Sequence, residues 1–241
     1  MGINSPFFVF IIDNKVLFYY VLLKKFYMKR LTELMNKYGS DKGTEFAEGH
    51  GFSEFYNDFF EKYTNPRILE IGVWHGNDIA AISEFYNGDC EIYGFDIDKT
   101  CQRFEETVKN FHFVYLNQSN KNELIDFVNS DIAKDGFDII IDDGSHQWHD
   151  QMLSLAYLNK CLRNGGIYII EDLHTSAPWY NWDNGDVTTV DSLVYHIPNT
   201  KITEEENRMW MDNIETVLTQ TKTNKNNNKS ITSVLVFKTK K

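Results

Sequence analysis

The alternation of short apolar runs with amphipathic segments limits the folds open to this chain more than any other feature of its sequence. The apolar runs lie at 67–71, 91–95, 111–116, 137–141 and 166–170. Segments with helical spacing lie between or after them, at 77–87, 99–109, 120–133 and 147–163. Strands that are apolar on both faces and alternate with helices are typical of a mostly parallel sheet covered by helices on both sides. The pattern therefore predicts an α/β fold.

The C-terminal part carries a different pattern. Residues 214–220 ("IETVLTQ") and 231–238 ("ITSVLVFK") are typical of two strands, and the stretch between them is polar and rich in Asn and Lys. We expect these strands to form an antiparallel hairpin with a solvated turn. Added to the five parallel strands, the hairpin gives a predicted sheet of seven strands.

The N-terminus stands apart from the rest of the chain. Within 1–27, polar residues at 13–15 split the apolar sequence into two runs that are each too short to span a membrane. We expect 1–27 to be a leader that the folded domain does not need; the alternatives are a helix docked on the domain and contact with a membrane. Residues 28–66 are expected to form an N-terminal helical cap, and 67–241 the main α/β domain.

Charge and cysteine content exclude some classes of function. The net charge of -11 argues against nucleic-acid binding, because a phosphate backbone requires a basic surface. Cys90, Cys101 and Cys161 form an odd set without the spacing of a metal site. Such cysteines suit a reducing compartment, so we expect a cytoplasmic protein.

Polar residues gather where the predicted strands end. They are Glu70, Gly72 and Gly76 for the first strand, Asp96 and Asp98 for the second, Asn117 and Gln118 for the third, Asp142 and Asp143 for the fourth, and Glu171 and Asp172 for the fifth. Open α/β sheets bind ligands at the carboxyl ends of their strands. One acidic strand end is commonly a helix N-cap, but five strand ends of this kind favour a ligand site.

The first turn, "EIGVWHGN", indicates the class of ligand. Gly72 permits a sharp turn, and Gly76 permits a ligand to approach the backbone where the next helix begins. The G-x-x-x-G spacing differs from the G-x-G-x-x-G of dinucleotide sites. Asp96, at the end of the next strand, is placed to accept two ribose hydroxyls. An acidic loop beside a ribose site suits a positively charged nucleoside such as S-adenosylmethionine (SAM).

Within the class I SAM-dependent methyltransferases, the sequence resembles the metal-dependent sugar O-methyltransferases of the mycinamicin and macrocin type. The resemblance is carried by "IDDGSH" at 141–146 together with "GGIYIIEDLHTS" at 165–176. The stretch "YGSDKGT…HGFSEFYNDFF" at 38–60 also resembles the segment that precedes their core. The likeness covers roughly 38–175.

The resemblance implies a Rossmann-like class I methyltransferase fold and a role for each strand-end residue. It implies that Asp143, Glu171 and Asp172 bind Mg²⁺ and that His146 is the catalytic base. It implies that SAM is held by Glu70, Gly72, Asp96, Gln118 and Asp142, to which the glycine turn adds Gly76. The implied acceptor is a sugar or a sugar nucleotide, whereas the hydroxyl position and a homo-oligomeric state stay open.

The chemistry of methyl transfer independently calls for these residue types. A sugar hydroxyl is a poor nucleophile while it is protonated, and a hard cation with oxygen ligands makes its proton easier to lose. An imidazole titrates in the range suited to accept that proton. Three clustered carboxylates would repel each other unless a cation lay between them. Glu171 and Asp172 are adjacent, so both can reach one ion only if the strand ends and the chain turns there.

Several alternatives remain open from the sequence alone. The acceptor could be an amine on a small phosphorylated compound. His146, Asp143 and Glu171 could instead form the iron triad of a cephalosporin-hydroxylase-like enzyme. Asp142 and Asp143 could merely cap the following helix. The loop with Trp179, Tyr180 and Trp182 could be either a substrate lid or a small hydrophobic cluster; we expect the lid.

Overall fold

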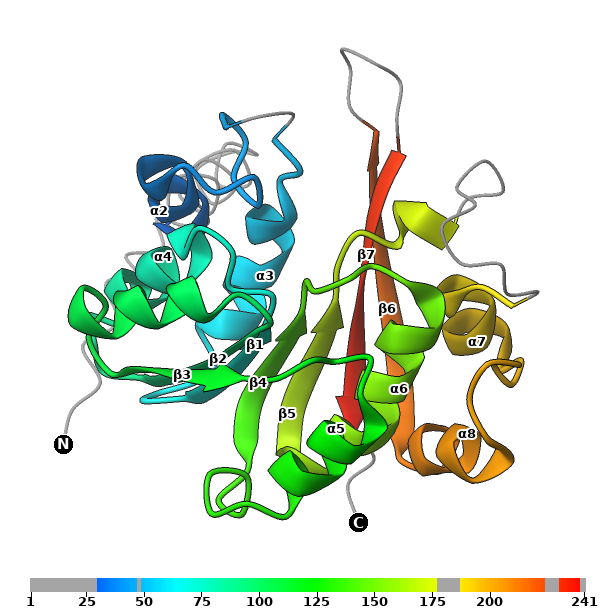
Figure 1. Ribbon diagram of the computed structural model, residues 1–241. Coiled ribbons are helices and arrows are strands. Elements are labelled where there is room, and N and C mark those ends of the chain that lie inside the picture. The colour runs from blue at the N-terminus through cyan, green and yellow to red at the C-terminus, as the bar shows by residue number, and fades with distance from the viewer. Residues whose placement is uncertain (1–29, 47–48, 177–186, 224–229, 239–241) are drawn as a thin grey trace, which may run out of the picture.

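A seven-stranded sheet forms the centre of the fold (Figure 1). The computed structural model describes residues 30–46, 49–176, 187–223 and 230–238. The strands are β1 (Arg67–Ile71), β2 (Glu91–Asp96), β3 (Phe111–Tyr115), β4 (Phe137–Asp142), β5 (Leu162–Ile170), β6 (Ile214–Thr223) and β7 (Ser230–Lys238). Their order is β3-β2-β1-β4-β5-β7-β6. Strands β1 to β5 pair in parallel, and β7 pairs antiparallel with β5 and β6, so the fold is of the predicted α/β class.

Helices cover both faces of this sheet (Figure 1). One face carries α2 (Arg30–Tyr38), α3 (Phe52–Phe60), α4 (Asn77–Phe85) and the 3-10 helix η1 (Lys99–Glu106). The other face carries α5 (Lys121–Val128), α6 (Trp148–Leu158), α7 (Thr189–Tyr195) and α8 (Glu204–Met211). The 3-10 helices η2 (Asn159–Cys161) and η3 (Leu173–Ser176) precede and follow β5.

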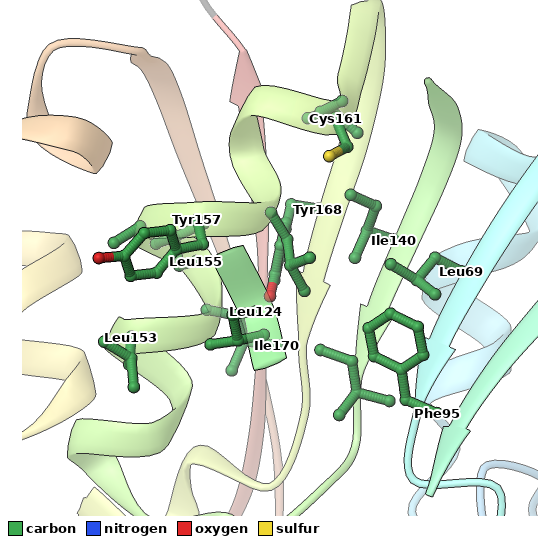
Figure 2. Packing of buried hydrophobic residues seen from close by; sticks show 14 of the residues in the cluster. Leu69, Phe95, Leu124, Ile140, Leu153, Leu155, Tyr157, Cys161, Tyr168 and Ile170 are labelled. Atoms are coloured by element: carbon green, nitrogen blue, oxygen red, sulfur yellow. The ribbon is translucent and has the colours of Figure 1, made fainter. Parts of the chain in front are cut away.

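Two hydrophobic cores lie on the two faces and explain why the strands are apolar throughout. Leu69 and Ile140 pack in the core under α5 and α6, part of which Figure 2 shows. Their chain neighbours Ile68 and Ile139 pack in the core under α2 to α4, because successive strand residues point to opposite faces. All four are fully buried, and each such burial contributes about 1.5–3 kcal/mol.

Three of the predicted helices are shorter or tighter than expected, and the one predicted over 120–133 ends at Val128. Within the segment 99–109, Lys99–Glu106 forms a 3-10 helix in which Cys101 alone is buried, so packing stabilises little of it and a regular α-helix does not form. The predicted helix 147–163 ends at Leu158, and β5 already begins at Leu162. The first part of β5 contains polar and glycine residues. The apolar pattern of the sequence therefore predicted that this strand begins later, at 166.

Some expectations fall on residues that are not described. The predicted leader 1–27, the aromatic loop at 177–186 and the hairpin turn at 224–229 all lie outside the described ranges. Within the predicted cap 28–66, α2 and α3 contribute buried side chains to the same core as α4. None of the helices in the described ranges has the length and apolar character needed to cross a bilayer.

Candidate functional site

A cavity of about 550 Å³ opens at the carboxyl ends of the parallel strands. The predicted site residues that line it are Gly72, Gly76, Asp96, Gln118, Asp143, His146 and Asp172. Glu70, Asp142 and Glu171 do not line it, since each is at most 1% exposed. The strand ends therefore meet at one cavity, and three of the predicted side chains are buried beside it.

The turn after β1 requires glycine for reasons of both conformation and packing. Gly72 has a φ of 90°, and a Cβ added there would lie 2.2 Å from the carbonyl oxygen of Asp143. The β1 and β4 loops thus touch each other at this point. Gly76 begins α4 with a φ of 69°, and its added Cβ would lie 2.8 Å from the ring of Phe104. Gly76 thus makes room for η1 as well as lining the cavity.

Asp96 organises this turn through its carboxylate. Its Oδ2 accepts hydrogen bonds from the backbone N–H groups of Val73 (2.9 Å) and Trp74 (3.0 Å). Its Oδ1 accepts one from the N–H of Asp98 at 2.8 Å. Oδ1 has a further lone pair to offer, whereas Oδ2 already accepts two hydrogen bonds. Trp74, which the sequence analysis did not single out, and Ile97 line the cavity and are each 65% exposed, so they offer apolar surface beside Asp96.

Asp142 is buried behind the cavity wall and is hydrogen-bonded to a residue that lines the cavity. Its Oδ1 accepts a hydrogen bond of 3.1 Å from Nε2 of Gln118. The Oε1 of Gln118 in turn accepts one of 2.6 Å from the N–H of Ser145. Burial raises the pKa of the Asp142 carboxyl to about 7, although the hydrogen bond from Gln118 lowers it. Asp142 therefore acts on the cavity through Gln118 and the loop after β4.

We expect Asp142→Asn to raise the free energy of unfolding at pH 8 and to leave it nearly unchanged at pH 4. The folded-state pKa lies above the unfolded value of about 3.9, so the folded protein binds this proton more tightly and loses stability as the pH rises from about 4 to 7. A gain of about 1–3 kcal/mol at pH 8 is expected, because three pKa units set an upper bound of about 4 kcal/mol.

Urea unfolding with chelator present, at both pH values, measures this difference. Asp131→Asn is the matched control, since the Asp131 side chain is 95% exposed. An equal effect of Asp142→Asn at pH 4 and pH 8 would contradict the raised pKa.

The loops after β4 and β5 bring Asp143, His146 and Asp172 together. One ligand atom of each lies within 4.8 Å of the other two. His146 has a φ of 58° and Asp172 a φ of 54°, and this left-handed conformation is strained for residues with a Cβ. Because β5 ends at Ile170, both Glu171 and Asp172 lie beyond the strand, where the sequence analysis requires a turn.

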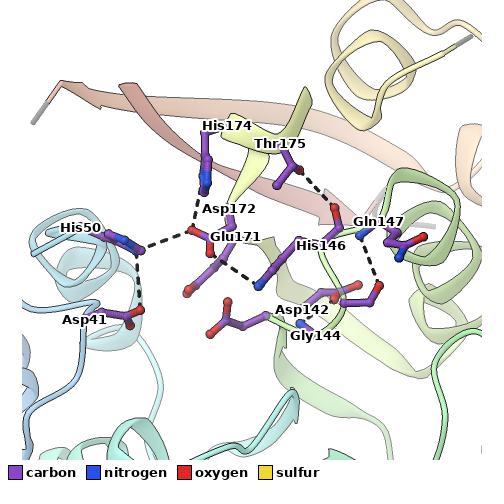
Figure 3. A network of polar contacts seen from close by, with 12 residues as sticks. Asp41, His50, Asp142, Gly144, His146, Gln147, Glu171, Asp172, His174 and Thr175 are labelled. Atoms are coloured by element: carbon purple, nitrogen blue, oxygen red, sulfur yellow. Dashed lines mark hydrogen bonds and ion pairs between the residues drawn. The ribbon is translucent and has the colours of Figure 1, made fainter. Parts of the chain in front are cut away.

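Three imidazoles surround Asp172 (Figure 3). Nε2 of His146 lies 3.6 Å from Oδ2 of Asp172. Oδ1 of Asp172 lies 3.6 Å from Nδ1 of His50 and 3.7 Å from Nδ1 of His174. His50 had no role that could be assigned from the sequence. It lies in the loop before α3, and the fold brings it to Asp172, from which it is distant in the sequence.

Lys42 is a further residue that the sequence analysis missed. Its Nζ lies 2.5 Å from Oδ2 of Asp143, 2.5 Å from Oδ2 of Asp78 and 3.3 Å from Oε2 of Glu171. The residue is 1% exposed. Burial alone would lower the pKa of the Lys42 ammonium, but the charges of Asp143 and Asp78 raise it well above its ordinary value. The sequence feature that could have pointed to Lys42 as a site residue is its position inside the motif "YGSDKGT".

If all were ionised, the carboxyls beside Lys42 would carry more charge than one ammonium can balance. Burial raises the pKa of Glu70 well above its ordinary value, and the charge of Asp78 raises it further. Burial also raises the pKa of Glu171 well above its ordinary value, against the charge of Lys42, and that of Asp143 to about 6. This surplus of negative charge suits a cation.

The donor atoms left over at this site fit a hard divalent cation. Glu171 Oε1 and His146 Nδ1 are buried and make no hydrogen bond within the described part of the chain, and Asp172 Oδ1 has only the longer contacts with the imidazoles of His50 and His174. A buried polar atom left unpaired costs about 1–3 kcal/mol, so such atoms favour a bound partner. Carboxylate oxygens are the ligands that Mg²⁺ prefers. The residues therefore fit the predicted Mg²⁺.

Comparison of sequences identifies O-methyltransferases as relatives, although no family model matches the chain. Demethylmacrocin O-methyltransferase of Streptomyces fradiae is 31% identical over 196 residues, which are 74% of this chain and 47% of that protein. Mycinamicin VI 2''-O-methyltransferase of Micromonospora griseorubida is 33% identical over 156 residues, which are 61% of this chain and 36% of that protein. The chain thus spans about half the length, or less, of these curated relatives.

Comparison of structures identifies the same group. The MycE methyltransferase from the mycinamycin biosynthetic pathway, solved in complex with Mg and SAH, aligns with a TM-score of 0.64 and 25% identity. The alignment covers 99% of this chain and 68% of that one. The chain therefore has the Rossmann-like fold of the class I SAM-dependent methyltransferases and is related to the sugar O-methyltransferases of the macrocin and mycinamicin type.

Proposed function

We propose that this chain is a SAM-dependent and Mg²⁺-dependent O-methyltransferase that methylates a hydroxyl of a sugar, either nucleotide-linked or part of a glycoconjugate. The observation that carries the proposal is the cluster of Asp143, His146 and Asp172 on the wall of the strand-edge cavity. This cluster places cation ligands and an imidazole next to a space of suitable size for a nucleoside and an acceptor. The Mg and SAH bound to MycE support the choice of cofactors.

The cofactor half of the cavity would be formed by the glycine turn and the two following strand ends. Asp96 would accept hydrogen bonds from the ribose hydroxyls, and Gly72 and Gly76 would leave space for the amino-acid part of SAM. Trp74 and Ile97 would contact the adenine through their exposed apolar surface. Gln118, fixed by Asp142, would complete the wall on the β4 side.

The acceptor half would combine cation ligands with a base. Mg²⁺, when bound, would make a coordinated acceptor hydroxyl easier to deprotonate. Asp143, Asp172 and the unpaired oxygen of Glu171 would supply its protein ligands. His146 would accept the proton of the acceptor hydroxyl as the methyl group is transferred. Its contact with Asp172 at 3.6 Å would stabilise the imidazolium that results.

A sugar acceptor is supported by the named substrates of the relatives, whose methylation sites include a 2''-hydroxyl. Two vicinal hydroxyls can bind one cation as a chelate, which suits the open side of the cluster. The non-haem iron alternative has less support. Its usual triad has two histidines and one carboxylate, whereas the cluster of Asp143, His146 and Asp172 has one histidine.

The proposed function is tested by incubating the protein with SAM and a panel of sugars and nucleotide sugars. We expect a product heavier by one methylene group from acceptors with a vicinal diol, and less product from matched deoxy sugars. Chelator should stop the reaction and Mg²⁺ should restore it. Turnover that requires Fe²⁺ and a reductant but no SAM would replace the proposal by the hydroxylase alternative. Methylation of an amine without a metal would favour the N-methyltransferase alternative.

We expect Asp96→Ala to weaken SAM binding by about 2–4 kcal/mol, because a charged acceptor for two hydroxyls and for the turn N–H groups is lost. Calorimetric titration with SAM measures the loss. Asp98→Ala is the matched control, since the Asp98 carboxylate accepts from Thr100 at the start of η1 and does not line the cavity. Unchanged affinity in Asp96→Ala would remove Asp96 from the cofactor site.

We also place the protein in a reducing compartment such as the cytoplasm. Cys90, Cys101 and Cys161 are all buried and form no disulfide bond among the described residues, which supports this placement.

A further inference from the structure

Lys42 lies on the inner side of the proposed cation site. We define the outer cluster as Asp143, His146 and Asp172, and the inner cluster as Glu70, Asp78 and Glu171, which surround Lys42 together with Asp143. The residues of the outer cluster line the cavity, as does Asp78 of the inner cluster. Lys42, Glu70 and Glu171 do not line it and are almost completely buried.

Lys42 divides the oxygens of the carboxylates between the two clusters. Its Nζ lies 2.5 Å from Oδ2 of Asp143 and 3.3 Å from Oε2 of Glu171. The second oxygen of Glu171, Oε1, is buried and makes no hydrogen bond to any described residue. One oxygen of each carboxylate thus faces Lys42, and the second oxygen of Glu171 stays available to a ligand.

Without an ammonium at this position, the inner cluster would attract a divalent cation strongly. Asp78, Asp143 and Glu171 would then converge on one buried point with no positive charge. Charges interact more strongly there than at the cavity wall, because less solvent screens them. Asp78 and Asp143 line the cavity, whereas Lys42 does not line it and is 1% exposed, so a cation in place of its ammonium would lie behind those two side chains and away from an acceptor hydroxyl.

We propose that Lys42 is a positioning residue that occupies the inner cluster and so confines the divalent cation to the outer cluster, beside the cavity. Only the expected effect of Lys42 on catalysis rests on the proposed function. The confinement of the cation concerns binding and can be measured without turnover. Lys42 thereby reduces the total affinity for divalent cations while directing the bound cation to the productive position.

The test measures Mn²⁺ binding by electron paramagnetic resonance in the wild type and in Lys42→Met. We expect Lys42→Met to bind Mn²⁺ at least about tenfold more tightly, since one positive charge beside the site is removed. We expect kcat to fall on the order of 100-fold while the affinity for SAM stays unchanged. A merely structural role would weaken cation binding and activity together, so opposite signs distinguish positioning from structural damage.

Lys37→Met is the matched control. Lys37 pairs with Glu84 at 2.5 Å, but its side chain is 55% exposed and lies outside the inner cluster. This variant should leave Mn²⁺ affinity and kcat unchanged. Weaker or unaltered Mn²⁺ binding in a folded Lys42→Met protein would overturn the proposal.

A second measurement uses the wild type and does not depend on the variant folding. In crystals soaked with Mn²⁺, the anomalous signal should lie beside Asp143 and Asp172, with Nζ of Lys42 still in contact with Asp143 and Glu171. A Mn²⁺ ion at the position of Nζ, with Lys42 displaced, would overturn the proposal. If Mn²⁺ binds at the outer cluster but no sugar is methylated, the proposed function fails while the role of Lys42 in cation placement stands.

Discussion

Asp172→Asn is expected to lower kcat for methyl transfer on the order of 10²–10³-fold, because the carboxylate supports both the cation and His146 and its loss removes several kcal/mol of transition-state stabilisation. Oδ2 of Asp172 lies 3.6 Å from Nε2 of His146, and Oδ1 makes no hydrogen bond among the described residues. The affinity for SAM should stay nearly intact, since the proposed cofactor contacts lie at other strand ends. Initial rates at saturating SAM, with Mn²⁺ and SAM affinities measured in parallel, test this expectation.

Asp131→Asn is the control for the same chemical change at an exposed position, and it should keep the wild-type rate. Chelator should lower the wild-type rate to the level of Asp172→Asn. A variant that lost SAM affinity together with kcat would show that Asp172 belongs to the cofactor site. A wild-type rate unaffected by chelator would require another explanation for the carboxylates of the outer cluster.

His146→Ala is expected to lower kcat on the order of 10²–10⁴-fold, the usual contribution of a general base. Its residual rate should rise with pH, because hydroxide replaces the missing proton acceptor. The strained φ of 58° at His146 indicates that the loop after β4 holds this imidazole in a defined place. The pH–rate profile of the variant against that of the wild type is the measurement.

His146 could act as the base or as a cation ligand, since its ring also belongs to the outer cluster. Measuring the Mn²⁺ affinity of His146→Ala distinguishes these two roles. Unchanged Mn²⁺ affinity in His146→Ala identifies the side chain as the base. A loss of Mn²⁺ affinity equal to the loss of kcat identifies it as a cation ligand, and the base must then be another group. His112→Ala is the control, since its side chain is 48% exposed, on β3.

The position of the site followed from local patterns in the sequence. Gly72, Asp96, Gln118, Asp143 and Asp172 come from different strand ends, and all line one cavity. Parallel strands bring their carboxyl ends to the same edge, so the order of strands and helices in the sequence suffices to predict that these residues meet. The direction of each side chain did not follow in the same way. Glu171, predicted as a metal ligand, is buried beside the cavity and does not line it, and its Oε2 lies 3.3 Å from Nζ of Lys42.

Two residues of the site, Lys42 and His50, could not be predicted from the pattern of strands in the sequence. Lys42 and His50 come from the segment between α2 and α3, which returns over the sheet edge to reach Asp143 and Asp172. Lysine is almost never fully buried unless it is paired, so no periodicity argument places Lys42 inside the protein. Its partner Asp143 is distant in the sequence, and only the packing of the helical segment on the sheet brings the two together.

The sequence by itself determined the fold class and the edge of the sheet that carries the site, because apolar periodicity and strand-end residues are local properties of the chain. The tertiary structure decided which oxygens of Asp143 and Glu171 face Lys42 and that Oε1 of Glu171 is left without a hydrogen bond from the described residues. It also set the raised pKa values of Glu70, Asp142 and Glu171, because these shifts arise first from desolvation and then from charges brought near by folding. Burial and distances between remote residues exist only in the folded chain, and they set the electrostatics on which the proposed chemistry depends.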